Sequence, residues 1–367
     1  MSGLAGASGV PTSHNNLVVS DVSRFVFCLG VNPVGSSDID PLLVRWSDQE
    51  SLVDWTPSAT NQAGSLRLSQ GSKIITGANS RQAVLIWTDA ALYSLQYVGA
   101  PIVWGANLVG ENISIASKNA VAYANGIAYW MGTDKFYKYD GRTETLNCDL
   151  RRYVFNDFNE AQYEQVFAGT NESFNEIWWF YCATGSDVPN RYIIYNYAEN
   201  VWYFGNLTRT AWVDSGARDH PLAATTSGKL VEHEQGLDDN ETGTPAAITA
   251  FITSADFDLD DGDRLFLVNR IMPDVTFDGS TAVSPSVTLT LDPLTDSGSG
   301  IKSTPSEGGN SSGTVTRSAT SPVEAFTSQL DVRVRGRQLN LKIQSSAVGV
   351  QWQLGSPRLD MRPDGRR

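Results

Sequence analysis

The densest group of possible metal ligands is the acidic run Asp256–Asp263, in which aspartates alternate with two apolar residues. An EF-hand calcium loop needs glycine at its sixth position and a bidentate glutamate at its twelfth. Counted from Asp256, those positions hold Asp261 and Leu267, so the run fails both requirements. The alternation instead predicts an amphipathic strand that enters a turn.

Carboxylates could also act as a pair in glycoside hydrolysis. The segment Ser47–Trp55 resembles the Asp-box turn of sialidase propellers, Ser-x-Asp-x-Gly-x-x-Trp, but neither the aspartate nor the glycine falls at the required position. We interpret it as a turn between two strands. A catalytic pair elsewhere stays open, because the 40 acidic residues offer many pairs and their separation is a property of the three-dimensional structure.

The histidines do not form a metal-binding pattern. The chain has three, at His14, His220 and His233. In Glu232-His233-Glu234, strand alternation would place the glutamates on one face and the histidine on the other, and a metal would need further ligands. We therefore predict a hydrogen-bonding histidine.

The cysteines indicate buried, reduced thiols. They are Cys28, Cys148 and Cys182, far apart and without a CxxC motif, which fits a reducing compartment. The chain contains no GxSxG, Walker or GxGxxG motif. We expect no catalytic, cofactor-binding or metal-binding residues, no cofactor and no enzymatic activity.

A basic strand near the C-terminus is the strongest candidate contact site. Arg333, Arg335 and Arg337 alternate with Val332, Val334 and Gly336. Residues 324–367 carry a net charge of +4, and the rest of the chain carries −17. Such a strand face is either solvated or an electrostatic seat for an acidic neighbouring subunit, so the three arginines are predicted subunit-interface residues.

Composition excludes several function classes. The 367 residues are 41% apolar and 18% charged, with a net charge of −13 and a pI near 4.7, which indicates a globular protein of two or three domains. The acidic balance disfavours a protein that grips nucleic acid through phosphate contacts, because such contacts need a basic surface. No run of 18 apolar residues occurs, and the first residues lack the charge and apolar core of a secretory signal, so neither membrane insertion nor secretion is expected.

Short β-rich runs separated by turns predict an all-β chain. The strongest hairpin signal is Ala124-Asn125-Gly126, between two apolar runs. A strand–turn–strand pattern recurs at Trp87–Tyr93, Met131–Tyr137 and Thr225–Val231, and the first two copies are about 45 residues apart, close to one propeller blade. The pattern favours a β-propeller over a sandwich for this part of the chain.

Two further segments refine this picture. The aromatic run Trp178–Tyr181 could stack sugars or bases, but alternating aromatics in a sheet more often pack between layers, which is the interpretation preferred here. The one expected helix covers Asn156–Gln165, with Phe155, Phe158 and Tyr163 on a shared face.

The expected architecture is a β-propeller-like domain of antiparallel blades followed by a C-terminal β-sandwich-like domain. The predicted boundaries are a flexible N-terminal segment (1–22), the propeller-like domain (23–237), an acidic linker (238–245) and the sandwich-like domain (246–367). A stretch of Ser, Thr, Gly and Pro at 296–322 has almost no large apolar residue and is predicted to be a long mobile loop.

An ordered series of short motifs carries a resemblance to a known family. The motifs are Trp46-Ser47-Asp48, Trp55-Thr56-Pro57, Asn61–Gly64, Trp87-Thr88-Asp89, Tyr97–Pro101, Tyr129-Trp130-Met131, Tyr139-Asp140-Gly141, Glu176–Tyr181, Thr210-Ala211-Trp212, Glu234-Gln235-Gly236, Arg333–Arg337, Trp352–Gly355 and Asp364-Gly365-Arg366. In this order they resemble the tail nozzle, tail hub or DNA-stabilisation proteins of short-tailed bacteriophages, from about Arg24 to Arg367.

The resemblance implies a virion structural protein built on a β-propeller. Six copies would form a ring below the portal and adaptor, contact other tail proteins such as fibres or spikes, and line the channel through which the genome leaves. The protein would assemble in the host cytoplasm and reside in the virion tail. An acidic wall is compatible with this role, because it repels the phosphates of passing DNA.

Two other classes stay open. One is a glycan-binding or glycan-degrading propeller that acts as a receptor-binding tail protein, for which two carboxylates about 5–9.5 Å apart across a pocket are needed. The other is a monomeric carbohydrate-binding module.

Overall fold

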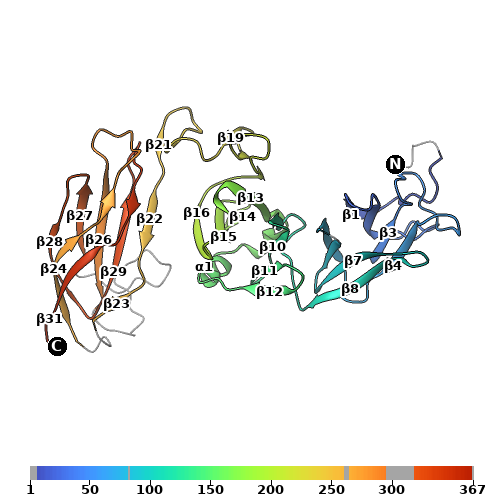
Figure 1. Cartoon of the computed structure of the whole chain (residues 1–367), viewed down its shortest axis with the longest axis horizontal. Coiled ribbons are helices and arrows are strands. Elements are labelled where there is room, and N and C mark those ends of the chain that lie inside the picture. Colours follow the sequence, from blue (N-terminus) through green and yellow to red (C-terminus); the bar gives the residue numbers. More distant parts are fainter. Residues whose placement is uncertain (1–5, 82, 260–263, 295–317, 366–367) are drawn as a thin grey trace. The chain divides into compact units, whose positions relative to one another are not determined.

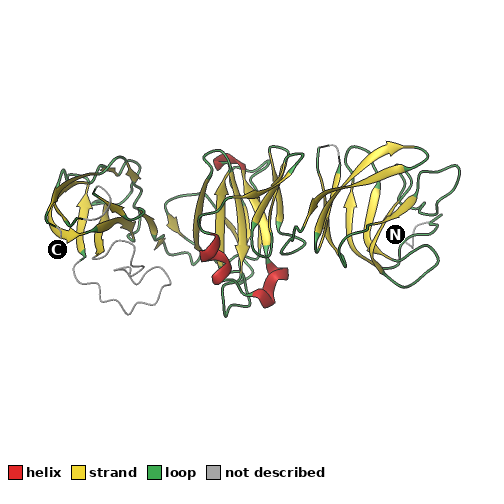
Figure 2. Ribbon diagram, turned by 90° about the horizontal axis from the view of Figure 1, so that it is seen from below, coloured by secondary structure: helices red, strands yellow, loops and turns green. Residues whose placement is uncertain are grey.

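The computed structural model describes residues 6–81, 83–259, 264–294 and 318–365. The chain divides into two compact units, Met1–Glu234 and Gln235–Arg367. Strands dominate, and helical segments are few (Figures 1 and 2). Among the described residues, no helix is both long enough and apolar enough to cross a membrane.

The first unit contains consecutive antiparallel meanders, in which strands adjacent in sequence are hydrogen-bonded neighbours. We call them sheets I to V. Sheet I has strands β1 (His14–Val19), β2 (Val26–Val31), β3 (Asp40–Trp46) and β4 (Gly64–Arg67), and sheet II has β5 (Ile74–Asn79), β6 (Val84–Thr88), β7 (Ala91–Gly99) and β8 (Val103–Glu111). Sheet III has β9 (Val121–Ala124), β10 (Ile127–Met131), β11 (Phe136–Tyr139) and β12 (Thr143–Leu146). Sheet IV has β13 (Phe167–Asn171), β14 (Glu176–Tyr181), β15 (Arg191–Asn196) and β16 (Val201–Asn206), and sheet V has β17 (Ala211–Val213), β18 (Leu222–Ala224) and β19 (Leu230–Glu232).

The turns follow the local sequence signals. Asn125 and Gly126 join β9 to β10 with φ of 51° and 77°, the left-handed conformations that a two-residue hairpin loop requires. The three recurring strand–turn–strand segments all connect the second and third strands of a sheet, in sheets II, III and V. The repeat therefore marks equivalent positions in successive sheets.

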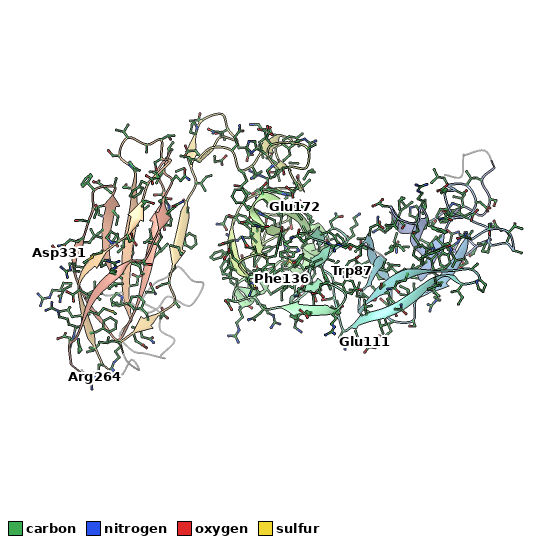
Figure 3. All side chains as sticks on the ribbon, in the orientation of Figure 1. Trp87, Glu111, Phe136, Glu172, Arg264 and Asp331 are labelled. Carbon is green, nitrogen blue, oxygen red and sulfur yellow. The ribbon has the colours of Figure 1, made fainter. Side chains whose placement is uncertain are left out.

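Successive sheets pack face to face through buried aromatic residues. One apolar cluster joins sheets I and II, a second joins sheets II, III and IV, and a third joins sheets IV and V. Trp87 of sheet II meets Trp130 of sheet III edge-on at 5.4 Å between ring centroids, and Trp178 of sheet IV stacks on Trp212 of sheet V at 5.0 Å. Figure 3 shows Trp87 and Phe136 inside this unit. The unit is a β-propeller-like domain of antiparallel blades, as the sequence predicts.

The two terminal sheets of this unit differ in their outward faces. The outer face of sheet I is covered, because Val26, Cys28 and Val31 pack with Trp55 and with Val10 of the N-terminal segment. The outer face of sheet V leaves Val213 and Leu230 exposed at 55% and 76%.

The N-terminal segment is ordered, so the prediction of a flexible segment over 1–22 is wrong for its described residues. Residues 14–19 form β1, and Ser8 exchanges backbone hydrogen bonds with Val53 and Trp55. The buried guanidinium of Arg45, 1% exposed, donates to the carbonyl oxygens of Gly9, Asn32 and Trp55. A buried charge from the sheet therefore holds this segment.

The expected single helix is also wrong, because it is two short segments: α1 (Arg151–Asn156) and the 3₁₀ helix η1 (Glu160–Gln165). Residues 157–159 instead bond to the strand end at 182–184, where the Asn159 amide donates to the Cys182 carbonyl at 2.9 Å. Phe155, Phe158 and Tyr163 still contact one another in series. A second 3₁₀ turn, η2 (Glu172–Phe174), precedes β14.

The second unit is β-sandwich-like. Its larger sheet has the order β22 (Ala250–Thr253), β29 (Gln338–Ser345), β26 (Ser286–Leu294) and β27 (Ala319–Glu324), and β23 (Phe257–Asp258) also pairs with β29. Its smaller sheet has the order β28 (Leu330–Gly336), β24 (Phe266–Met272) and β31 (Arg358–Pro363), and β25 (Val275–Thr276) pairs with β30 (Gln353–Leu354). One apolar core, which includes Phe266, Leu289 and Ile343, lies between them.

Two segment predictions need correction in this unit. The predicted linker at 238–245 is part of a small hairpin, because β20 (Asp238–Asp239) pairs with β21 (Ala246–Ala247). Most of the predicted loop at 296–322 lies outside the described residues, but its last residues belong to β27, paired with β26. In both segments, backbone hydrogen bonds to a neighbouring strand form the β-structure, and the amino-acid composition of a segment does not reveal such bonds.

Candidate functional site

Among the described residues, the fold brings Glu176 and Glu234 together as a carboxylate pair in an unusual environment. Glu176 begins β14 of sheet IV, and Glu234 follows β19 of sheet V in the left-handed conformation, with φ of 60°. Asn171, fully buried at the end of β13, is paired with Glu176 in the sheet register, and its Nδ2 donates to Glu234 Oε1 at 3.3 Å. The indole of Trp178 donates to Glu176 Oε2 at 3.0 Å.

Both carboxyl groups are harder to ionise than usual. Burial raises the pKa of Glu176, and the negative charge of Glu234 raises it further, while the Trp178 and Asn171 hydrogen bonds act in the opposite direction. Burial also raises the pKa of Glu234, and the Asn171 hydrogen bond and the charge of His220 partly offset it. Coupled carboxyls of this kind occur in general acid–base sites and in structural hydrogen-bond networks.

The surroundings of the pair favour the structural role. The side chains of Asn171 and Trp178, which belong to sheet IV, already donate hydrogen bonds to the two carboxyl groups. The Oδ1 atom of Asn171 is buried without a hydrogen-bond partner among the described residues, so the amide is held by its Nδ2 contact. Two clefts in the described part of the chain are lined by neither glutamate.

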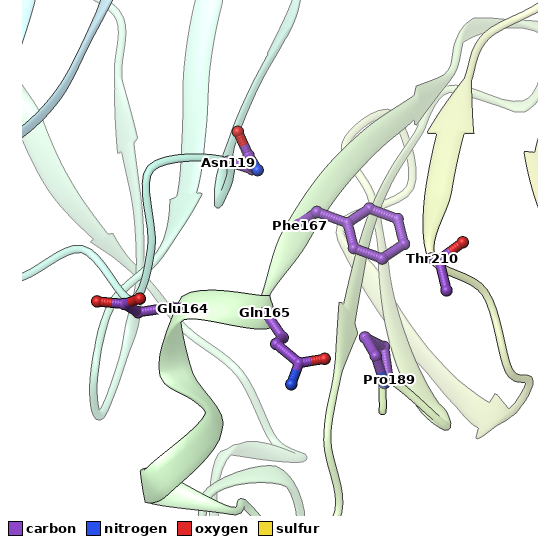
Figure 4. Close-up of a pocket in the computed structure, with 6 residues that line it drawn as sticks. All are labelled: Asn119, Glu164, Gln165, Phe167, Pro189 and Thr210. Atoms are coloured by element: carbon purple, nitrogen blue, oxygen red, sulfur yellow. The ribbon is translucent and has the colours of Figure 1, made fainter. Parts of the chain in front are cut away.

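Those two clefts are poorly equipped for glycoside hydrolysis. The first, of about 200 Å³, is lined by Asn119, Glu164, Gln165, Phe167, Pro189 and Thr210, and so contains one carboxylate (Figure 4). The second, of about 450 Å³, lies at the turn between β11 and β12, where Asp140 and Glu144 are 3.9 and 2.9 Å from the ammonium of Lys138. Both of these carboxylates lie against one ammonium group, whereas the two carboxyl groups of a glycosidase flank the scissile bond from opposite sides.

The predicted arginines do not lie together as one uniform face. Arg333 and Arg335 are exposed on the same side of β28, and Arg337 is half-buried in the turn that leads to β29. Arg335 forms an ion pair with Asp364 and donates to its carbonyl oxygen at 2.8 Å. Arg333 has no ion-pair partner within the described ranges, so it is the most available positive charge of the three.

The remaining candidates have structural surroundings. His233 accepts a hydrogen bond from Arg209 Nε at 3.0 Å and packs against Trp212, as the prediction of a hydrogen-bonding histidine requires. The aromatic run Trp178–Tyr181 is buried between sheets, as predicted. The acidic run Asp256–Asp263 contributes β23, and its residues 260–263 lie outside the described residues. In the part of the chain that the structure describes, no three His, Cys, Asp or Glu side chains form a metal-ligand group.

The three cysteines are buried and unpaired, as predicted. Burial raises the pKa of Cys28 and of Cys148 to about 12 and that of Cys182 to about 11. At neutral pH all three are therefore protonated thiols, which are poor nucleophiles.

Sequence reasoning missed the pair of Glu176 and Glu234. Asn171 connects the two glutamates, because it pairs with Glu176 in the sheet register and donates to Glu234. Asn171 and Glu234 are 63 positions apart in the sequence, and no spacing rule links positions in two different sheets. The only local signal is the Glu-x-Trp order of Glu176 and Trp178 at the start of a strand.

Comparisons with known proteins add little. No family model matches the chain, and no curated protein matches it. Among solved structures, the crystal structure of Kluyvelomyces marxianus Hsv2 has 8% identity and a TM-score of 0.35, over 57% of this chain and 56% of that one. The extracellular domain of the one component system BT4673 from B. thetaiotaomicron has 10% identity and a TM-score of 0.32, over 62% of this chain and 33% of that one. The chain thus matches about half of the first structure and a third of the second, and similarity this low carries no functional argument.

Proposed function

We propose that this chain is a structural subunit of a bacteriophage tail, in the nozzle or hub ring below the portal and adaptor. Copies of the chain form a ring, for which the family resemblance implies six-fold symmetry, and the channel of the ring retains and then releases the genome without specific binding. Its neighbours are the adaptor and tail proteins such as fibres or spikes. The ordered motif series between Arg24 and Arg367 supports the family, and the charge distribution supports the role.

The observation that carries the proposal is an acidic excess in both units. Residues 1–234 contain 15 basic and 23 acidic side chains, a net charge of −8, and residues 235–367 contain 12 and 17, a net charge of −5. A wall made from either unit therefore repels phosphate. DNA that must slide through a channel needs such a wall, because positive charge would release counterions and retain it.

The decisive experiment is electron microscopy of particles that contain this chain, with mass spectrometry to identify it. We expect a ring of copies around the tail axis below the adaptor. Absence of the chain from purified particles, or a peripheral position off the channel, would refute the proposal.

A second candidate is a glycan-degrading tail protein, which only the raised pKa values of Glu176 and Glu234 favour. The test incubates the full chain and its E176Q and E234Q variants with capsule and lipopolysaccharide glycans and measures reducing ends. The leading proposal expects no turnover by any of the three. Turnover by the wild type that E176Q and E234Q each abolish would establish the enzyme instead.

A further inference from the structure

Sheet V has one strand fewer than the other sheets of the first unit. Among the described residues, sheets I to IV contain four strands each, and sheet V contains three and ends at β19. The next strand along the chain, β20, pairs with β21 and not with β19. Every described strand of the chain already belongs to a sheet, so none of them is left to complete sheet V.

The fourth strands of sheets II and IV each place a tryptophan against the preceding sheet. Trp104 of β8 meets Phe27 of sheet I edge-on at 4.8 Å between ring centroids. Trp202 of β16 packs on Phe136 of sheet III at 4.8 Å, and its indole donates to the Asn147 carbonyl at 2.8 Å. A fourth strand of sheet V would occupy the equivalent place over sheet IV.

Sheet IV is uncovered at this place. Trp178, Ile194 and Tyr203 are neighbours in the sheet register and project from the face toward sheet V, because directly paired residues share a face. Trp178 and Ile194 are 7% and 6% exposed, but Tyr203 in β16 is 45% exposed. Val201, two residues earlier in β16 and on the same face, is 39% exposed. Sheet V therefore covers the inner strands of sheet IV and leaves β16 open.

The backbone of β19 has an open edge beside this place. Its hydrogen bonds to β18 are made at alternate residues, one of which is His233, whose amide donates to the Pro221 carbonyl at 2.9 Å. In an antiparallel ladder, the backbone groups of the intervening residues Leu230 and Glu232 point away from β18. In the described part of the chain no other strand pairs with β19. The two residues therefore present backbone donors and acceptors to a further strand.

This edge is acidic at one end. Glu232 is exposed in β19, Glu199 is exposed in the turn before β16, and Glu176 begins β14. Within the described ranges none of the three forms an ion pair. Burial raises the pKa of Tyr203, and the charges of Glu176 and Glu199 raise it further, so both lie near the open face. Lys229 precedes the opposite end of β19, so the acidic character is confined to the end at Glu232.

We propose that sheet V binds an extended segment of another protein as its fourth strand. The backbone groups of Leu230 and Glu232 supply the main-chain hydrogen bonds. A large apolar side chain of the segment covers Val201 and Tyr203, and lysine or arginine residues meet the end at Glu232. The inference goes beyond the proposed function and does not depend on it, because it uses only contacts within the first unit.

Charge and strand count favour another protein over a second copy of this chain. The chain carries a net charge of −13, so a second copy has the same sign as the end at Glu232. Its described strands are already placed in sheets, as they are in the first copy. A basic segment of a different protein satisfies both conditions.

The test measures binding of synthetic peptides to the purified full chain by calorimetry. The probe is Lys-Val-Lys-Trp-Thr-Val-Thr, which can place its second lysine opposite Glu232, its tryptophan beside Val231 and its first threonine opposite Leu230. We expect a dissociation constant on the order of 100 μM. The peptide Glu-Val-Glu-Trp-Thr-Val-Thr should bind about tenfold more weakly because like charges meet. Lys-Val-Lys-Trp-Pro-Val-Thr should also bind about tenfold more weakly, because proline removes a ladder donor.

Variants of the chain locate the site. Y203A and E232K should each weaken binding of the lysine peptide about tenfold, through lost apolar contact and like charge. L230P should do the same to within about threefold while it keeps the pairing of β18 with β19, because it removes an amide that points away from β18. E232K should bind the glutamate peptide to within about threefold of the wild-type affinity for the lysine peptide. The control V22K changes a residue of the same unit that is 77% exposed, and it should bind like the wild type.

Hydrogen exchange identifies the occupant. The amides of Leu230 and Glu232 should exchange rapidly in the isolated chain and gain protection when the lysine peptide is added. Protection in the dilute isolated chain would show that the chain completes sheet V itself, and protection that grows with its own concentration would show a second copy; either result overturns the proposal. It is also overturned if the lysine peptide does not bind at about 1 mM, if the lysine and glutamate peptides bind equally, or if Y203A binds like the wild type.

Discussion

Replacement of Glu176 by glutamine separates a structural carboxylate pair from a catalytic one. Glutamine keeps the size of the side chain and an oxygen that can accept the Trp178 hydrogen bond, but it removes the charge that repels Glu234. If the pair is structural, the variant is more stable than the wild type at neutral pH.

The sign follows from proton linkage. The pKa of Glu176 and of Glu234 is raised in the folded chain, so the folded state binds more protons than the unfolded state above the ordinary value of 4.5. Stability contributed by these groups is therefore present at acid pH and is lost as the pH rises through the raised values. Below the ordinary value both carboxyls are neutral in both states, and glutamine changes little.

The magnitude is modest because the pair is partly open to solvent. Glu176 is half-buried, and the carboxyl group of Glu234 is partly desolvated although the residue as a whole is exposed, so screened repulsion of about 0.5–1 kcal/mol is the appropriate scale. For a unit of this size, about 1 kcal/mol corresponds to a shift in Tm of roughly 2–4 °C.

Urea unfolding followed by tryptophan fluorescence reports this unit, since nine of the ten tryptophans lie in residues 1–234. We expect E176Q to raise the midpoint at pH 8 and to leave it unchanged at pH 4. The matched control is E172Q, an exposed glutamate of the adjacent 3₁₀ turn, which should have no effect at either pH. A lower midpoint for E176Q at pH 8 would contradict the argument, because it would mean that the ionised carboxylate stabilises the fold.

Four further outcomes follow from the described contacts, burial and charge. The R45M variant should lower the free energy of unfolding by about 2–4 kcal/mol, because three carbonyl groups lose a charged donor. In this variant the amides of residues 8–19 should lose protection from hydrogen exchange first. Unchanged protection there would show that Arg45 does not hold the N-terminal segment. The G169A variant should lower the free energy of unfolding, measured with denaturant, by about 1–3 kcal/mol. The reason is that an added Cβ collides with the indole of Trp212 between sheets IV and V. An unchanged free energy of unfolding would mean that this interface is loosely packed. The thiol of Cys28, like the other two, should react with Ellman's reagent only after unfolding, and rapid reaction of the native chain would contradict its burial. Duplex DNA in gel-shift assays at about 50 mM salt should not be retained, and a salt-dependent complex would count against an acidic channel wall.

Local sequence predicted the elements well where the cause of the structure is itself local. Asn125-Gly126 forms its hairpin because both residues tolerate positive φ. The aromatic run Trp178–Tyr181 is buried because large apolar side chains on a strand pack between sheets. The strand–turn–strand repeat marks equivalent turns because each sheet is a meander of the same order.

Only the tertiary structure decided the features that join distant positions. Asn159 was expected in a helix, but its amide bonds to Cys182, so a contact between segments outweighs a weak local preference. The N-terminal segment lacks the composition of a core element, but the Arg45 guanidinium holds it through three carbonyl groups. The environment of Glu176 likewise depends on Asn171 and Glu234, which belong to different sheets.

The same division applies to the interface arginines. Their alternation identified a basic strand, because side chains of a strand alternate between its two faces. Which of them is available depended on Asp364, which pairs with Arg335 and leaves Arg333 without an ion pair in the described ranges. The sequence by itself determined strands, turns and charge, because these depend on single residues and their neighbours. The fold decided which edges and charges remain open, because that depends on what the rest of the chain has already paired.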